Sequence, residues 1–314
     1  MTEKGYPAKT WWRFQTWPEP VYYGGSHGGL GASSASTIPN PVYGNLYDPD
    51  TPGAGGTNGS GGGIVRLDVE GTLTVDGTIA AIGSVNSGAG AGGSISIRAD
   101  IITGQGSIHA DGGHSNGNYG GSGGRIALLD YSLLAGAFDP AEVTTDNFGI
   151  SAAGGGTGLY GAAGTIFLKA KDDSWGTLIA DNKGSTTDAD TTTWLPGVTV
   201  SNIGALSEIT IEDSAAGFEP DLYAGYLLNP NREQGAPTLT DDQFYMIATN
   251  DAHSITVLSG DLTNVASVGA TYGSIFVFNR LYLLGGAKVY APGDMLIRGA
   301  GGSAVIRGNS GLEA

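Results

Sequence analysis

The chain has 314 residues, with 56 glycines and no cysteine, and its 30 acidic against 14 basic side chains give a formal net charge of −16. The lack of cysteine excludes disulfides and cysteine-ligated zinc. The acidic balance leaves no basic stripe to neutralise phosphates, so it excludes a nucleic-acid partner. No apolar run approaches the roughly 18 residues of a membrane-spanning helix, so we expect no insertion into a membrane.

Residues 1–60 combine a dense group of aromatic side chains with a loop stretch rich in glycine and proline. One interpretation is an N-terminal cap that covers the apolar end of the domain that follows. The other is a platform on which sugar rings stack, because aromatic faces suit that contact. The candidate carbohydrate-binding residues are Trp11, Trp12, Trp17, Tyr22 and Tyr23.

Residues 61–216 are organised by a repeat. The stretch GGGIVRLDVEGTLTVDGTI from Gly61 returns in related form from Ala91, Ser122 and Ala162. Each copy opens with small residues and continues into a strand in which apolar and polar side chains alternate. A period of this length is typical of stacked repeats, where each unit buries its apolar face against its neighbours.

The repeat also predicts a register. Val65, Ile95, Ile126 and Ile166 hold equivalent places. Because no helical pattern separates the strands, we expect these four residues to lie on adjacent strands of one parallel sheet. About ten extra residues before the fourth copy predict a projecting loop within 138–158. The fold class predicted is all-β, a parallel β-helix (solenoid) with a small inserted β-subdomain.

The composition changes near residue 217. Residues 217–272 contain less glycine and more Tyr and Phe, which predicts the inserted β-subdomain. The solenoid pattern returns in 273–314, for example at 274–277, and breaks off at the end of the sequence. We therefore expect the chain to be part of a longer protein.

Two groups of motifs carry a resemblance. GSHGGLG (25–31), YGNLYDP (43–49) and the 61–79 run resemble glycine-rich repeat regions of very large secreted or surface-anchored bacterial proteins. LNPN (228–231) with ITVLSGDL (255–262) is similar to an insert that accompanies such repeats. The resemblance implies a β-solenoid in an adhesin-like protein, extracellular or on the bacterial cell surface. It implies no activity.

Calcium is the metal that the composition favours, because Ca²⁺ takes carboxylate and carbonyl oxygens as ligands. The glycine-rich turns lack the regular Asp of calcium-binding repeats, so only isolated sites remain. The candidate ligands are Asp48, Asp50, Asp241 and Asp242, each of which could equally be part of a solvated turn.

One cluster could support acid–base chemistry. His109, Asp111 and His114 fall at the end of the second copy, and Arg125 opens the next strand. Such a group on a β-helix face could act on a polysaccharide. However, the outward positions of the copies form no carboxylate cluster of the kind that glycoside hydrolysis needs. We therefore expect a non-catalytic structural or adhesive module whose partners are a polysaccharide or neighbouring solenoid units. The alternative is a carbohydrate-binding or polysaccharide-degrading protein.

Overall fold

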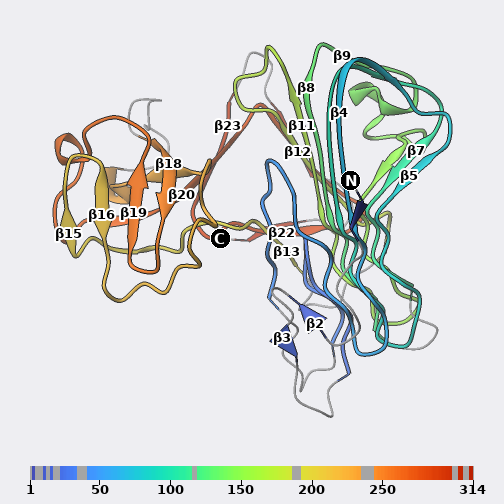
Figure 1. Cartoon of the computed structure of the whole chain (residues 1–314), viewed down its shortest axis with the longest axis horizontal. Helices are drawn as coiled ribbons and strands as arrows, with labels where there is room; N and C mark the ends of the chain where they lie inside the picture. The colour runs from blue at the N-terminus through green and yellow to red at the C-terminus, as the bar shows by residue number, and fades with distance from the viewer. Residues whose placement is uncertain are drawn as a thin grey trace. The chain divides into compact units, whose positions relative to one another are not determined.

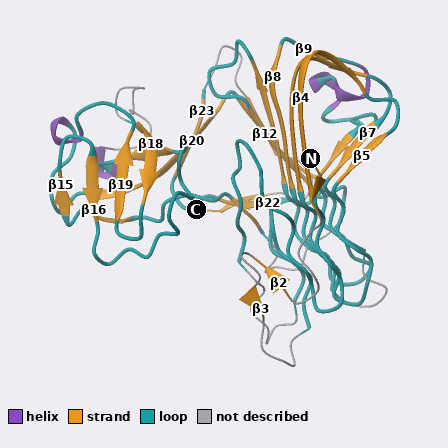
Figure 2. Cartoon of the chain, viewed as in Figure 1, coloured by secondary structure: helices purple, strands orange, loops and turns teal. Residues whose placement is uncertain are grey.

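Strands and loops make up the structure, which is all-β as the sequence predicts (Figure 2). It is a computed structural model that describes residues 2–3, 10–11, 15–16, 22–33, 41–114, 119–185, 192–234, 244–298, 303–306 and 311–313. The helices of this part are short 3₁₀ turns, and none of them has the length and apolar character to cross a membrane. They are η2 (Gly136–Phe138), η3 (Pro140–Glu142), η4 (Arg232–Gln234) and η6 (Leu262–Asn264).

The chain forms two units. The first comprises Met1–Trp194, Phe278–Tyr290 and Arg298–Glu313, and the second Leu195–Val277 with Ala291–Ile297. Within the described residues, the strands of the first unit are β1 (Thr2–Glu3), β2 (Thr10–Trp11), β3 (Gln15–Thr16), β4 (Ile64–Thr74), β5 (Thr78–Ala80), β6 (Ser94–Thr103), β7 (Ser107–His109), β8 (Arg125–Tyr131), β9 (Leu133–Leu134), β10 (Ile150–Ser151), β11 (Thr165–Ala170), β12 (Thr177–Asp181), β13 (Thr193–Trp194), β21 (Arg280–Leu284), β22 (Lys288–Tyr290), β24 (Ser303–Ile306) and β25 (Gly311–Glu313).

The predicted register of the repeat is confirmed. Strands β4, β6, β8 and β11 are parallel neighbours; β4, β8 and β11 are labelled in Figure 1. Val65, Ile95, Ile126 and Ile166 are paired from strand to strand. Inward side chains such as Ile95 and Ile126 are fully buried in one apolar core. A second parallel sheet, β5–β7–β10, closes the other side of this core with Ile108.

The outer face of the main sheet is partly covered as well. Ser96, a polar residue of the alternating pattern in β6, is buried, and its hydroxyl donates to the Asp48 carboxylate. The Ser94 hydroxyl donates to the Thr51 carbonyl in the same way. The loop around residues 41–57 therefore packs against this face, which explains how strands with alternating patterns become buried on both sides.

The sheets are mixed, and a continuous parallel stack is not what the first unit shows. Strand β12 runs antiparallel to β11, and β21 and β24 then extend the sheet parallel to β12. The loop predicted to project from the repeat instead folds back. Its residues Phe138, Val143 and Phe148 are buried in the core.

Glycine-rich segments connect the strands and bond to one another through their backbones. The N–H groups of Gly93, Gly124 and Gly164 donate to the carbonyls of Ala81, Ala110 and Ala152, each at 2.7 Å. The glycine that precedes two of these donates to a neighbouring segment instead: Gly92 bonds to Ser122 and Gly123 to Ala162, both at 2.9 Å. Each segment is thus hydrogen-bonded to more than one neighbour, and a Cβ at Gly93, Gly124 or Gly164 would overlap a carbonyl oxygen.

The second unit is built on antiparallel pairing. Its described strands are β14 (Ser201–Asn202), β15 (Ala205–Leu206), β16 (Thr210–Glu212), β17 (Leu227–Asn229), β18 (Tyr245–Asn250), β19 (Ser254–Val257), β20 (Thr271–Phe278) and β23 (Asp294–Ile297). The unit spans the predicted 217–272 range, but it begins at Leu195 and so includes residues 195–216, which the sequence assigned to the repeats. The strand predicted at 274–277 forms, but within β20, which pairs antiparallel with β14 and β17.

A glycine-to-alanine pair tests the close packing of the glycine segments. A Cβ at Gly93 would overlap the carbonyl oxygen of Gly63, whereas a Cβ at Gly77 meets no atom within 4 Å. We expect Gly93→Ala to lower the free energy of unfolding by about 2 kcal/mol or more, since the backbone itself must shift. Gly77→Ala should change it by less than about 1 kcal/mol. Urea unfolding followed by circular dichroism measures the free energy of unfolding of both variants. Equally small effects of the two substitutions would show that the glycine segments are not closely packed at Gly93.

Candidate functional site

The His109/Asp111 pair predicted from the sequence forms at the end of β7. The Nδ1 atom of His109 lies 3.0 Å from Oδ2 of Asp111. The other carboxylate oxygen accepts hydrogen bonds from the Ser151 hydroxyl at 2.6 Å and the Ala153 N–H at 2.7 Å. Burial opposes ionisation of Asp111, but the bonds from His109, Ser151 and Ala153 outweigh it and lower the pKa of this carboxyl. Asp111 thus ties β7 to the β10 segment.

The two remaining members of the predicted cluster bond elsewhere. His114 Nδ1 lies 3.3 Å from the Gly156 carbonyl oxygen. Arg125 is fully buried, and its guanidinium donates to the carbonyls of Tyr43 and Trp194 and to the Thr165 hydroxyl. Of the four candidate residues, the structure therefore shows contact between His109 and Asp111, while the hydrogen bonds of Arg125 serve a separate buried network.

His27 belongs to that buried network, a role that no sequence motif predicts. Its Nδ1 lies 2.8 Å from the Gly92 carbonyl oxygen and its Nε2 lies 3.1 Å from the Thr51 hydroxyl. Burial, and then the charge of Arg125, lower the pKa of His27 to about 3. The ring is therefore neutral at physiological pH, with Nδ1–H as donor and Nε2 as acceptor. His27 and Arg125 connect the N-terminal loops to the glycine segments.

The first predicted calcium position is occupied by cationic side chains of the protein. Oδ2 of Asp48 lies 3.0 Å from both Arg66 and Arg98, and Oδ1 accepts from Ser96. Arginine bonds of this kind compete directly with a metal ion for the carboxylate. Asp50 is exposed, and Asp241 and Asp242 lie outside the described residues. Within the described part of the chain, no group of three or more His and acidic side chains could hold a metal. A calcium site stays a prediction.

The aromatic candidates separate by exposure. Tyr22 is 59% exposed and available to a ligand, whereas Tyr23 is 1% exposed and cannot stack on a sugar. Burial raises the pKa of Tyr23 to about 12. The backbone of Trp11 lies in β2, and Trp12 and Trp17 lie outside the described residues. The carbohydrate platform therefore stays a prediction.

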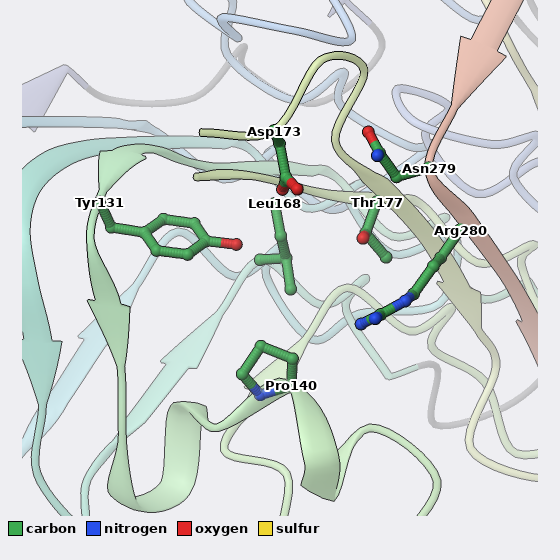
Figure 3. A pocket seen from close by; sticks show the side chains of 7 residues that line it. All are labelled: Tyr131, Pro140, Leu168, Asp173, Thr177, Asn279 and Arg280. Atoms are coloured by element: carbon green, nitrogen blue, oxygen red, sulfur yellow. The ribbon is translucent and has the colours of Figure 1, made fainter. Parts of the chain in front are cut away.

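A cavity of about 110 Å³ in the first unit was not anticipated from the sequence (Figure 3). It opens beside the ends of β8, β11, β12 and β21. Polar side chains dominate its lining: Tyr131, Asp173, Thr177, Asn279 and Arg280, with Leu168 and Pro140 as apolar neighbours. Figure 3 shows the Tyr131 hydroxyl and the Arg280 guanidinium pointing toward the same space.

A β-bulge places Tyr131 in this cavity. Asp130 adopts a positive φ of 57°, and the pairing with β11 shifts there, so that Ala170 pairs with Tyr131. The bulge turns Tyr131 inward where strict alternation would turn it to solvent. Burial raises the pKa of Tyr131, the nearby Asp173 charge raises it further, and Arg280 partly offsets both. The phenol is consequently a neutral donor.

Two wider hollows of about 470 and 500 Å³ lie on either side of the 142–149 loop. Both include Asp146, and backbone and acidic side chains make up much of their lining. The first also contains charged and hydroxyl groups, but its Lys183 is already paired with Asp181 at 3.0 Å. The second has the carboxylates of Glu142 and Asp146 and no cationic side chain in its lining.

Comparison with known proteins yields no family model, curated protein or solved structure that matches the chain.

The hydrogen bonds of Asp111 predict how stability depends on pH. Because its folded-state pKa lies below the unfolded value, the ionised carboxylate stabilises the fold above about pH 4, and this contribution is lost as the pH falls through the folded-state pKa. Asp111→Asn should reduce the free energy of unfolding at pH 7 by about 1–3 kcal/mol. The difference from the wild type should shrink in acid.

Denaturant titrations between pH 7 and pH 3 measure this effect. Asp172→Asn is the matched control, since Asp172 is exposed and outside the network. A deficit of Asp111→Asn that stays constant over the whole range would rule out the charge as its cause.

Proposed function

We propose that this chain is a non-catalytic structural or adhesive module of a bacterial extracellular or cell-surface protein, built from coils of parallel β-helix type. The observation that carries the proposal is the strand-by-strand register of β4, β6, β8 and β11. In the first two copies, the strand is followed by a short strand of the second sheet and then by a glycine segment; in the third, β9 and the 135–149 loop come before β10. Such a unit is a coil that stacks on the next.

The polar groups of the repeats support a structural role. Asp111 joins β7 to the β10 segment, Asp48 pairs with Arg66 and Arg98, and Arg98 also pairs with Asp130 at 2.6 Å. These groups hold neighbouring segments together. None of the networks leaves an acid and a base facing a common open space, which catalysis on a polymer would need.

The test is surface exposure of the protein on intact cells of the organism that encodes it. Antibodies against the folded chain should label intact cells, and external protease should remove the label. A cytoplasmic protein, labelled in parallel before and after lysis, is the control. Label that appears only after lysis would contradict the proposal.

The alternative, a polysaccharide-degrading enzyme, can be tested by an activity assay. The His109/Asp111 pair is the feature that favours it. If the pair catalyses cleavage, the chain should generate reducing ends or unsaturated products from a panel of acidic and neutral polysaccharides, and His109→Ala should abolish them. We expect no turnover with either protein.

A further inference from the structure

We propose that the Tyr131 cavity of the first unit is a binding site for one sugar residue, which it holds by two adjacent ring hydroxyls between Asp173 and Arg280. This site goes beyond the structural role, and it is distinct from the aromatic group of residues 1–60. If no sugar binds in this cavity, the proposal of a structural module is unaffected.

The first argument is that the cavity gathers polar atoms whose bonding capacity is unused. The Tyr131 hydroxyl, the Thr177 hydroxyl and the Arg280 guanidinium make no hydrogen bond or ion pair with the described residues. Tyr131 as a residue is only 7% exposed, and its hydroxyl points into the cavity (Figure 3). These donors and acceptors are therefore free to bond to a ligand that enters the cavity.

The second argument is that the lining is held in place before a ligand arrives. Oδ1 of Asn279 accepts the N–H groups of Trp175 and Gly176 at 2.7 and 2.8 Å, which leaves its NH₂ group for a ligand. One oxygen of Asp173 accepts the Ala170 N–H at 3.3 Å, and the carboxylate retains further acceptor capacity. The bulge at Asp130 fixes Tyr131 in turn.

The third argument concerns charge. Asp173 and Arg280 both line the cavity, yet they form no ion pair with each other. A sugar hydroxyl is both donor and acceptor, so adjacent hydroxyls can donate to Asp173 and accept from Arg280 and Asn279. A simple anion would satisfy Arg280 but be repelled by Asp173. The presence of both a carboxylate and a guanidinium therefore favours a neutral ligand that bears hydroxyl groups.

Size limits the ligand to a single ring edge. A cavity of about 110 Å³ has room for a few water molecules, each of which occupies about 30 Å³ in the liquid. It accommodates two hydroxyls and the carbons that bear them, while the rest of the sugar stays outside. Leu168 and Pro140 offer apolar surface to the C–H groups of the ring.

The experiment titrates the full chain, labelled with ¹⁵N, with the methyl glycosides of mannose, glucose and galactose. Signals from the Asn279 NH₂ and the Arg280 Nε–H report on the cavity. At least one glycoside should shift them with a dissociation constant on the order of 1–10 mM. Tetrahydropyran-2-methanol, a ring without adjacent ring hydroxyls, should produce no saturable shift.

Variants separate a sugar site from an anion site. Asp173→Asn should weaken glycoside binding about tenfold, because a charged acceptor is lost while an oxygen remains for Ala170 N–H. Tyr131→Phe, which keeps the ring, should weaken it about fivefold. Arg66→Ala, a surface arginine on β4, is the matched control and should leave binding unchanged.

Two results would overturn the proposal. One is the absence of any shift with all three glycosides at about ten times the expected dissociation constant. The other is saturable binding of acetate, at constant ionic strength, that Asp173→Asn strengthens, since that behaviour defines an anion site.

Discussion

The first unit depends on backbone hydrogen bonds that its glycine-rich segments make with one another. The N–H groups of Gly93, Gly124 and Gly164 bond to alanine carbonyls at the same place in successive copies, and the glycine before two of them bonds to the next copy. A buried backbone group must find a partner, and here the partner is another backbone. Each of these three glycines also lies so close to a neighbouring carbonyl that an added Cβ would overlap its oxygen. These bonds hold the ends of β6, β8 and β11 at one level, and that alignment lets Ile95, Ile126 and Ile166 meet in one core.

This construction determines where chemistry can occur. The glycines carry no side chains, and polar residues among them, such as His27 and Asp111, use theirs to join neighbouring segments. A ligand site is therefore more easily formed at the other ends of the strands and in the loops. There the repeat breaks down: Asp130 forms a bulge, β12 turns antiparallel, and the 135–149 loop packs beneath the sheet. The Tyr131 cavity lies at this irregular end, where departures from the repeat bring Asp173 and Arg280 to one space. The repeated strands form the rigid framework, and the irregular end holds the proposed sugar site.

The sequence predicted the repeat, its register and the all-β class because alternating side chains and a fixed period are local signals. It did not predict the antiparallel β12 or the buried outer face, which depend on contacts between distant segments such as Ser96 with Asp48. The candidate site was predicted in part: His109 and Asp111 meet because they are two residues apart, whereas Arg125 bonds to Tyr43 and Thr165 through the fold. Tyr131 and Arg280 are separated by half the chain, and strict alternation would have turned Tyr131 outward.

Hydrogen exchange of the glycine amides tests most directly whether backbone bonding between the glycine segments holds the first unit together. If it does, the N–H groups of Gly93, Gly124 and Gly164 exchange only on global unfolding of the unit, as slowly as the amide of Ile126 in the central strand β8. Gly77, in an exposed turn, should exchange rapidly and serve as the internal control. Rapid exchange at Gly93, Gly124 and Gly164 alongside a protected Ile126 would show that the sheet is stable without the glycine segments and would contradict the account.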